Sequence, residues 1–296
     1  MHLRGNLMLL LAAFIWGTTF VAQMVGMDGL GPFTYAAARY LLGFLFLLGL
    51  WYFWRGPRQT AKRAGTYHAG WKAGLGAGCI MFVATSLQQV AMLYTTAGKT
   101  AFITALYIIF VPLGAVFLGK RIHAENWLGA LLALAGLYFL SIHGEVSLSF
   151  GDGLVLISSL FWTAHILFID RFASLVDPIE LSTTQIGFCT VGSFLAAFLF
   201  EPVELQPILQ AWFPIFYGGV MSAGVAFTLQ ILGQQYAETA QAAIIMSFEA
   251  VFGVLSSWLL LGERMTALQV MGCVLMMAGM IITQIRPLLR DRRCSS

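Results

Sequence analysis

Ten apolar stretches follow one another along the chain, separated by short polar connections. Each is about as long as the roughly 20 mostly apolar residues that a helix needs to cross a bilayer. Because backbone groups in the hydrocarbon must bond within their own segment, such stretches predict helices. We expect transmembrane helices at residues 7–25, 33–54, 71–93, 97–117, 126–143, 153–171, 181–200, 212–235, 240–261 and 267–285. The pattern predicts an all-α membrane protein with ten transmembrane helices.

The prolines agree with these boundaries. Seven of the eight fall in or beside the connections, where a residue without an N–H is tolerated. Pro112 is the exception, because it lies well inside the fourth stretch. We expect it to kink or locally open that helix.

Composition excludes an ordinary soluble protein. The 296 residues are 59% hydrophobic and 10% charged, whereas soluble domains are about 45–50% apolar and about 25% charged. The four cysteines show neither metal-ligand spacing nor a disulfide framework, so we expect no metal and no cofactor. The N-terminal stretch resembles a signal peptide, but it continues to Met24 and a related segment recurs in mid-chain. We interpret it as the first transmembrane helix.

Lysine and arginine lie almost entirely on one side of the predicted helices. If the N-terminus is cytoplasmic, thirteen fall on the cytoplasmic side and one, Arg264, falls in an outer connection. The thirteen are Arg4, Arg55, Arg58, Lys62, Arg63, Lys72, Lys120, Arg121, Arg171, Arg286, Arg290, Arg292 and Arg293. Because positive residues collect in cytoplasmic connections, we expect both termini on the cytoplasmic side of the cell membrane.

The chain contains an internal repeat. The segment from Gly119 to Arg121 and the glycines at 129 and 136 recur, at one constant spacing, as the segment 262–264 and the glycines at 272 and 279. At a nearly equal spacing, Gly5, Trp16 and Pro32 recur as Gly151, Trp162 and Pro178. We expect one five-helix repeat over residues 1–143 and a second over residues 144–296, which ends in a short basic cytoplasmic tail.

Five helices per repeat is an odd number, so the second repeat must enter the membrane from the opposite side. The charges agree, because the Lys120-Arg121 connection falls inside and the Glu263-Arg264 connection falls outside. Such inverted-topology repeats are the common construction of secondary transporters. The sequence therefore favours transport, although a channel or a membrane enzyme can share this architecture.

Three segments resemble the EamA family of the drug/metabolite transporter superfamily. They are AAFIWGTTF together with the Ala-Ala-Ala-Arg39 of the second helix, TTAGKTAFITALYIIFVPLGAVFLGKR at 95–121, and SFEAVFGVLSSWLLLGER at 247–264. The resemblance covers both repeats. It implies ten helices in a bacterial inner membrane and the export of small metabolites such as amino acids, without fixing the substrate.

Glu249 is the main candidate for function. It lies about nine residues into the ninth helix, which places it roughly 14 Å deep, near the middle of the bilayer core. A side chain this short cannot reach the interface, so it must face the bundle interior, be neutral or have a partner. A carboxyl that exchanges protons there would suit proton-coupled transport, and a protonated carboxyl that bonds a neighbouring helix is the structural alternative.

Two cations also lie within predicted helices. Lys99 is near the outer face, where it either extends to the interface or faces a cavity and attracts an anionic substrate group. Arg39 lies about one and a half turns into the second helix, and its counterpart in the second repeat is Gln185. Its planar fork suits either helix-end carbonyls or a substrate carboxylate, and the structural role is the favoured interpretation.

The remaining candidates are aromatic and polar. Trp16 and Trp162 are related by the repeat and lie in mid-helix, where they either shape a cavity or pack, and the same choice holds for Tyr107. His165 is a candidate for substrate or proton binding, or for a packing role. A polar set shares the choice between lining a wet cavity and tying helices together. It comprises Gln23, Gln88, Gln89, Gln185, Gln230, Gln234, Gln235, Thr18, Thr19, Thr104 and Ser247.

The leading hypothesis is a secondary-active transporter that exports small metabolites by alternating access, with proton coupling left open. A passive facilitator or channel is the first alternative. A polytopic membrane enzyme is disfavoured, because the sequence has one mid-helix carboxylate and lacks the common catalytic motifs, and we expect the protein not to be an enzyme.

The expected partners are a small-molecule substrate and the lipid bilayer, with no nucleic acid. Gly74-x-x-x-Gly78 permits close helix packing within a monomer or a homodimer.

Overall fold

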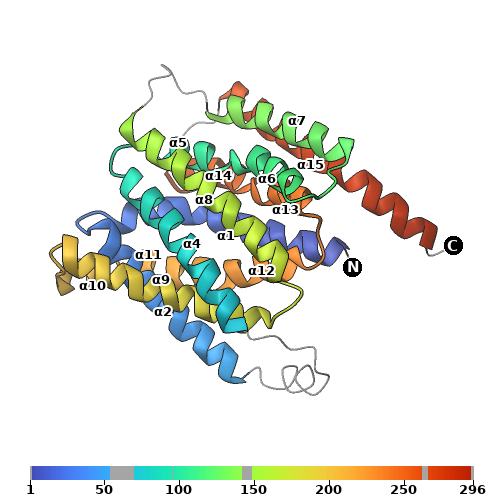
Figure 1. Cartoon of the computed structure of the whole chain (residues 1–296). Helices are drawn as coiled ribbons and strands as arrows, with labels where there is room; N and C mark the ends of the chain where they lie inside the picture. The colour runs from blue at the N-terminus through green and yellow to red at the C-terminus, as the bar shows by residue number, and fades with distance from the viewer. Residues whose placement is uncertain (1, 54–69, 96, 142–148, 262–265, 295–296) are drawn as a thin grey trace.

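The computed structural model describes residues 2–53, 70–95, 97–141, 149–261 and 266–294, and over these ranges the protein is all-helical (Figure 1). The helices in chain order are α1 (His2–Gly26), α2 (Pro32–Phe53), α4 (Gly70–Ala91), α5 (Ala97–Thr104), α6 (Tyr107–Phe117), α7 (Ala124–Ser141), α8 (Phe150–Phe172), α9 (Pro178–Phe200), α10 (Leu205–Gln210), α11 (Trp212–Phe216), the π-helix η1 (Tyr217–Ala226), α12 (Phe227–Gln234), α13 (Thr239–Met246), α14 (Glu249–Leu261) and α15 (Ala267–Cys294).

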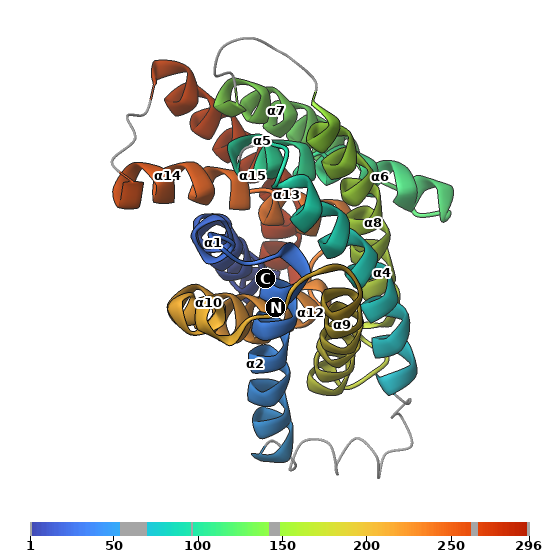
Figure 2. The ribbon, with the colours of Figure 1, turned by 90° about the vertical axis from the view of Figure 1, so that its left-hand side faces the viewer.

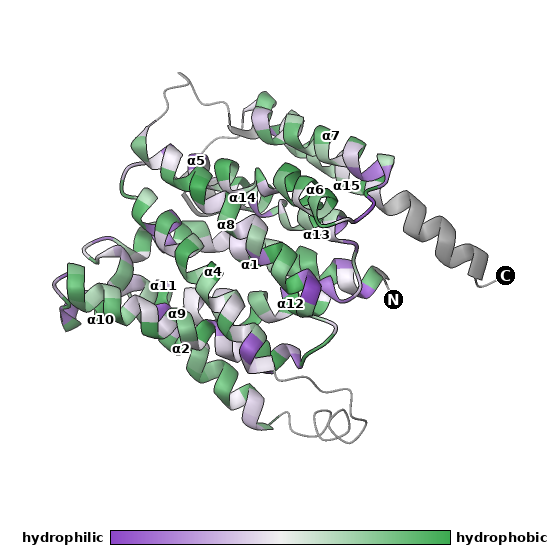
Figure 3. Cartoon of the chain, in the orientation of Figure 1, coloured by the Kyte–Doolittle hydropathy of each residue, from purple (hydrophilic) through white to green (hydrophobic). Residues whose placement is uncertain are grey.

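Eight segments of the described chain are long and apolar enough to cross a bilayer. They are Leu3–Gly26, Pro32–Phe53, Gly70–Ala91, Lys99–Phe117, Phe150–Phe172, Pro178–Phe200, Trp212–Gln234 and Thr239–Ser256. The other two expected helices are α7, which has 18 residues, and α15, whose apolar part is the shorter stretch Ala267–Thr283. Figure 3 shows apolar residues over most of the helical surface, with hydrophilic residues mainly near helix ends. The predicted ten-helix membrane fold is confirmed.

The chain begins and ends at the same end of the bundle. Both views place the start of α1 near the end of α15 (Figures 1 and 2), as an even number of crossings requires. Which face of the membrane this is stays a prediction. The basic connection with Arg55, Arg58, Lys62 and Arg63 lies outside the described residues, as does the segment 262–264 of the repeat.

The contact between α7 and α15 shows how the two repeats are related. A Cβ on Gly129 of α7 would lie 2.7 Å from the carbonyl oxygen of Gly279 on α15, and one on Gly136 would lie 2.5 Å from that of Gly272. Gly129 and Gly272 are repeat counterparts, as are Gly136 and Gly279. The contact is therefore reciprocal, which is the signature of a two-fold axis between the repeats. A two-fold axis between α7 and α15 is the arrangement of an inverted repeat.

Helices of one repeat pack mainly on helices of the other. In the first repeat, α1 packs on η1, α12 and α14 of the second, and in the second, α8 packs on α4, α5 and α6 of the first. The second helices of the two repeats, α2 and α9, also pack on each other. Gly74 and Gly78 serve the contact of α4 with α9, because a Cβ on either would lie within about 3 Å of an α9 carbonyl oxygen. The bundle is thus interleaved, and its centre is lined by both repeats.

The fourth transmembrane helix of each repeat is interrupted at the same place. The pairs α5–α6 and α13–α14 have starting residues that differ by the same 142 positions, and each pair is joined by two residues. Across both joints the backbone turns tighten: Leu106 N–H bonds the Ile103 carbonyl at 3.2 Å, and Phe248 N–H bonds the Ile245 carbonyl at 3.2 Å. Interrupted helices are typical of the central sites of secondary transporters.

The interruption in the first repeat is not at the proline. Pro112 was expected to kink or open the fourth helix, yet α6 continues through it to Phe117, and the break lies at Ala105 and Leu106. The second repeat breaks at the matching place without any proline there. Position in the repeat, and not the missing N–H of Pro112, therefore sets the break.

Replacing Gly136 by alanine tests the glycine contact on the axis. The new methyl group would meet the Gly272 carbonyl, so Gly136→Ala is expected to lower the free energy of unfolding by about 1–3 kcal/mol, measured by thermal or denaturant unfolding in detergent. Gly49→Ala on α2 is the matched control, because nothing lies within 4 Å of the new methyl group. Equal stability of the two variants would contradict the reciprocal contact.

Candidate functional site

A buried pocket lies where the two repeats meet. The volume in which the centre of a water-sized molecule fits is about 60 Å³. One water needs roughly 10–15 Å³ on the same measure, so the pocket has room for several. Six pairs of its lining residues are separated by 146 or 142 positions, the spacings of the repeat. The pairs are Trp16/Trp162, Phe20/Ile166, Thr85/Phe227, Gln88/Gln230, Thr104/Met246 and Tyr107/Glu249. The pocket therefore lies on the two-fold axis.

Glu249 and Tyr107 join the two repeats across this axis. Tyr107 is the first residue of α6 and Glu249 is the first residue of α14, so each follows the break in its helix. The Tyr107 hydroxyl donates to Glu249 Oε1 at 3.0 Å. Both side chains are buried and both line the pocket. The break in each helix thus brings a polar side chain to the centre of the bundle.

Aromatic rings form one wall of the pocket. The ring of Phe227 contacts both repeat-related indoles, with its centre 4.9 Å from that of Trp16 and 6.0 Å from that of Trp162, and it is stacked on Trp162. Both indole N–H groups are buried and have no protein partner among the described residues. Buried polar groups without a partner usually mark a water or ligand position. The wall thus offers apolar surface together with two free donors.

Amide groups add acceptors and donors to the same pocket. Gln23, Gln88 and Gln230 line it, and the Gln88 amide donates to the hydroxyl of Thr104 at 2.7 Å. The side-chain oxygens of Gln23 and Gln230 are buried and have no protein partner in the described chain. The pocket can therefore bind a polar solute through several hydrogen bonds.

Arg39 brings a positive charge to the pocket. Its side chain is buried, and one terminal nitrogen donates to the Tyr40 hydroxyl at 2.9 Å. It lies opposite no carboxylate among the described residues at ion-pair distance. Its repeat counterpart, Gln185, does not line the pocket.

His165 lies behind the pocket wall and does not line it. It is fully buried, and its Nε2 is 3.1 Å from the side-chain oxygen of Gln185. Its ring meets Trp162 and Phe227 edge-on, at 5.8 and 6.1 Å between ring centres. Its described contacts are thus one hydrogen bond and two ring contacts, while its Nδ1 is buried without a partner among the described residues.

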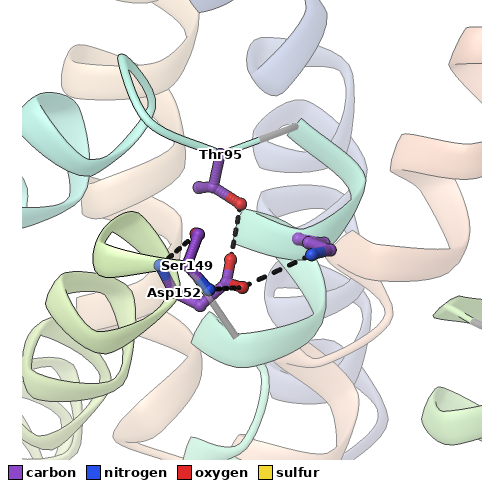
Figure 4. Close-up of polar contacts among 4 residues, drawn as sticks. Thr95, Ser149 and Asp152 are labelled. Atoms are coloured by element: carbon purple, nitrogen blue, oxygen red, sulfur yellow. Dashed lines mark hydrogen bonds and ion pairs between the residues drawn. The ribbon is translucent and has the colours of Figure 1, made fainter. Parts of the chain in front are cut away.

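Lys99 also lies away from the pocket. Its ammonium is 3.4 Å from a carboxylate oxygen of Asp152, at the start of α8. Thr95 donates to the other oxygen at 2.6 Å, and Ser149 and Asp152 form a capping box at the α8 N-terminus (Figure 4). The buried Asp152 carboxylate thus accounts for the position of Lys99, whereas the sequence had left open that Lys99 faces the cavity.

Of the seven residues singled out from the sequence, the structure gathers five in the pocket and leaves Lys99 and His165 outside it. The polar set divides in the same way. Thr19, Gln23, Gln88, Thr104 and Gln230 line the pocket, while Gln89, Gln234, Gln235, Thr18 and Ser247 bond other parts of the protein.

Sequence reasoning missed several lining residues. Tyr40, Thr85 and Ser222 were not singled out, and neither was Asp152, the partner of Lys99. The repeat spacing carried a usable signal, because Gln88 and Gln230 are 142 positions apart and so are Tyr107 and Glu249. The Ser149-x-x-Asp152 pattern likewise signals a helix start.

A five-helix repeat inverted about an axis, with a polar pocket on that axis, is typical of membrane transport proteins. The chain belongs to the EamA-like transporter family, which it matches over residues 3–142 and 149–285. It is a transporter of this family and not an enzyme.

Known proteins support this assignment over the whole chain. An uncharacterized transporter of Archaeoglobus fulgidus is 30% identical over 96% of this chain and 87% of that protein. A probable amino-acid metabolite efflux pump of Escherichia coli (strain K12) is 25% identical over 95% of each chain. The crystal structure of a protein with 19% identity matches in fold, with a TM-score of 0.75 over 99% of both chains.

Proposed function

We propose that the protein is a secondary-active exporter of small metabolites such as amino acids, and that it exposes the central pocket alternately to the two sides of the membrane. The observation that carries this proposal is the pocket on the two-fold axis, lined by residues of both repeats. Inverted repeats of this kind alternate by rocking about a fixed central site. The similarity to a probable amino-acid metabolite efflux pump supports the substrate class and the direction.

Glu249 is the residue we propose for proton coupling. It is a carboxyl in the middle of the pocket, and its described partner is the neutral Tyr107 hydroxyl. No cation of the described residues lies at ion-pair distance from it, so its charge can change as a proton is gained or lost. A solute and a proton that compete for this carboxyl would be exchanged across the membrane.

Two Lys–Asp pairs hold α8 against the first repeat, one near each end of the helix. Asp152 binds Lys99 of α5, and Asp170 binds Lys120, which follows α6. The two aspartates are 18 positions apart, which is roughly 27 Å along a helix. The hydroxyl of Thr239 joins the second pair, because it donates to Asp170 at 2.8 Å. We infer that these pairs close the two ends of the pathway, and that each must open in turn.

The proposed orientation places both termini in the cytoplasm, which assigns the Lys120–Asp170 pair to the cytoplasmic end. The bias of lysine and arginine toward that end supports it. Protease cleavage of a C-terminal tag from the cytoplasmic side only would agree, and cleavage from the outside only would refute it.

Transport in liposomes tests the proposed function. The purified protein is expected to accumulate at least one common amino acid against its gradient when a pH difference is imposed, and a protonophore is expected to abolish the accumulation. Movement that is only downhill would contradict secondary-active transport and indicate a passive facilitator.

The variant Glu249→Gln tests proton coupling in the same assay, and it is expected to remove the response of transport to pH. Glu204→Gln, at an exposed site between α9 and α10, is the matched control and should keep that response.

Cross-linking tests the two Lys–Asp pairs. In a background without other cysteines, Lys120→Cys with Asp170→Cys is joined by a cleavable bifunctional thiol reagent, and Lys99→Cys with Asp152→Cys is treated likewise. Either link is expected to stop transport, and reduction of the reagent should restore it, because each end must open once per cycle. A monofunctional reagent is the control. Full transport in either linked protein would show that this end does not open.

A further inference from the structure

We propose that Arg39 is an anion-binding residue of the pocket, and that it binds the carboxylate of the transported metabolite. This inference rests on the proposed function and adds to it the residue that recognises one chemical group of the substrate. The guanidinium is a cation in a transmembrane helix, and its side chain is only 5% exposed. A buried charge is costly unless an opposite charge and hydrogen bonds compensate it.

No carboxylate of the described residues lies at ion-pair distance from Arg39. Its neighbours are the rings of Tyr40 and Tyr35, 4.5 and 5.8 Å from the guanidinium carbon. One terminal nitrogen donates to the Tyr40 hydroxyl, whereas Nε is buried and has no partner in the described chain. Part of the planar fork is therefore free, and an arginine fork matches a carboxylate in shape and charge.

The residues around Arg39 hold it in a defined position. Tyr40 is fully buried, and the Tyr35 hydroxyl is anchored on the carbonyl of Pro214 at 3.3 Å. The π-helix η1 presents glycines to this part of α2, and a Cβ on Gly219 would lie 2.5 Å from the Arg39 carbonyl oxygen. Arginine held between two tyrosines and a close backbone loses little freedom when it binds an anion.

The fold itself does not demand a cation at this position. The counterpart of Arg39 in the second repeat is Gln185, a neutral residue that is fully buried and contacts His165. The two repeats therefore share their backbone arrangement and differ in charge here. Arg39 and Glu249 both line the pocket, so the site has a positive and a negative pole. A solute with a carboxylate and an ammonium group satisfies both.

Binding of matched ligands to the purified full-length protein in detergent tests this inference. The probes are L-phenylalanine, L-leucine and L-threonine, each compared with its amide, which keeps the ammonium group and lacks the carboxylate. The wild-type protein is expected to favour at least one acid over its amide by about 10- to 100-fold, the range expected for hydrogen bonds to a charged group. Absence of that preference for all three would overturn the proposal.

Arg39→Gln copies the residue of the second repeat and should remove the preference while the amide still binds, which also shows that the variant is folded. Arg39→Lys should restore part of it. Lys72→Gln removes an exposed cation of α4 that does not line the pocket and is the matched control, so it should keep the wild-type preference. Tyr40→Phe, which removes the bond that orients the guanidinium, should weaken the preference and provides a second test if Arg39→Gln does not fold. The proposal would be overturned if Arg39→Gln kept the preference for the acid, or if Lys72→Gln lost it. If Arg39→Gln does not fold, a full preference in Tyr40→Phe would overturn it instead.

The binding measurement needs no gradient, so it separates this inference from the proposed function. A wild-type protein that prefers the acid but moves nothing in liposomes would refute secondary-active export and leave the role of Arg39 standing. Active transport of amino acids together with equal binding of acids and amides would do the reverse.

Discussion

A carboxyl group in the middle of a bilayer must find a partner within the protein, and the hydrogen bond between Tyr107 and Glu249 meets this constraint. The two residues stand at equivalent positions of the two repeats. Each follows the point where its helix is interrupted, so the bond links the two interruptions across the axis. The polar pocket surrounds this bond. The helix breaks, the inverted repeat and the pocket are thus parts of one arrangement.

The two repeats share a backbone plan but not a chemistry. Matching residues of both repeats line the pocket, and the counterparts Trp16 and Trp162 both contact the ring of Phe227. The charges break this symmetry, because Glu249 is matched by a tyrosine and Arg39 by a glutamine. A symmetric backbone permits the same closure on either side of the membrane, while an asymmetric lining gives a solute one preferred orientation.

Much of the fold could be predicted from the sequence, because the bilayer imposes strong rules. The ten apolar stretches gave the helices, and the repeated glycines at 129, 136, 272 and 279 turned out to be the contact on the axis. The inner face of each helix was harder to predict. A transmembrane helix is apolar toward lipid as well as toward its neighbours, so periodicity does not separate the two. The polar residues at mid-helix therefore indicated a pocket as a group, but the sequence did not show which of them line it.

The misplaced candidates have specific physical causes. Lys99 lies near Asp152, a residue 53 positions away whose approach depends on the packing of α5 on α8. His165 lies one turn from Trp162 on α8, yet it contacts Gln185 of α9 and does not line the pocket. Pro112 predicted a kink or an opening at its own position, but the fourth helix is interrupted at the same place in both repeats, and only the first has a proline nearby. For Lys99 and His165, a contact between different helices outweighed a local pattern.

Labelling from the two sides of the membrane tests alternate exposure of the central pocket most directly. A cysteine in place of Ser222, which lines the pocket, would be treated with a membrane-impermeant thiol reagent in vesicles of each orientation, in a background without other cysteines. Alternating access predicts that the cysteine reacts from both sides and that a transported amino acid slows both reactions. The buried Ser193→Cys, which lies outside the pocket, should react from neither side. Reaction of the Ser222 position from one side only, under every gradient and substrate condition, would contradict alternating access through this pocket.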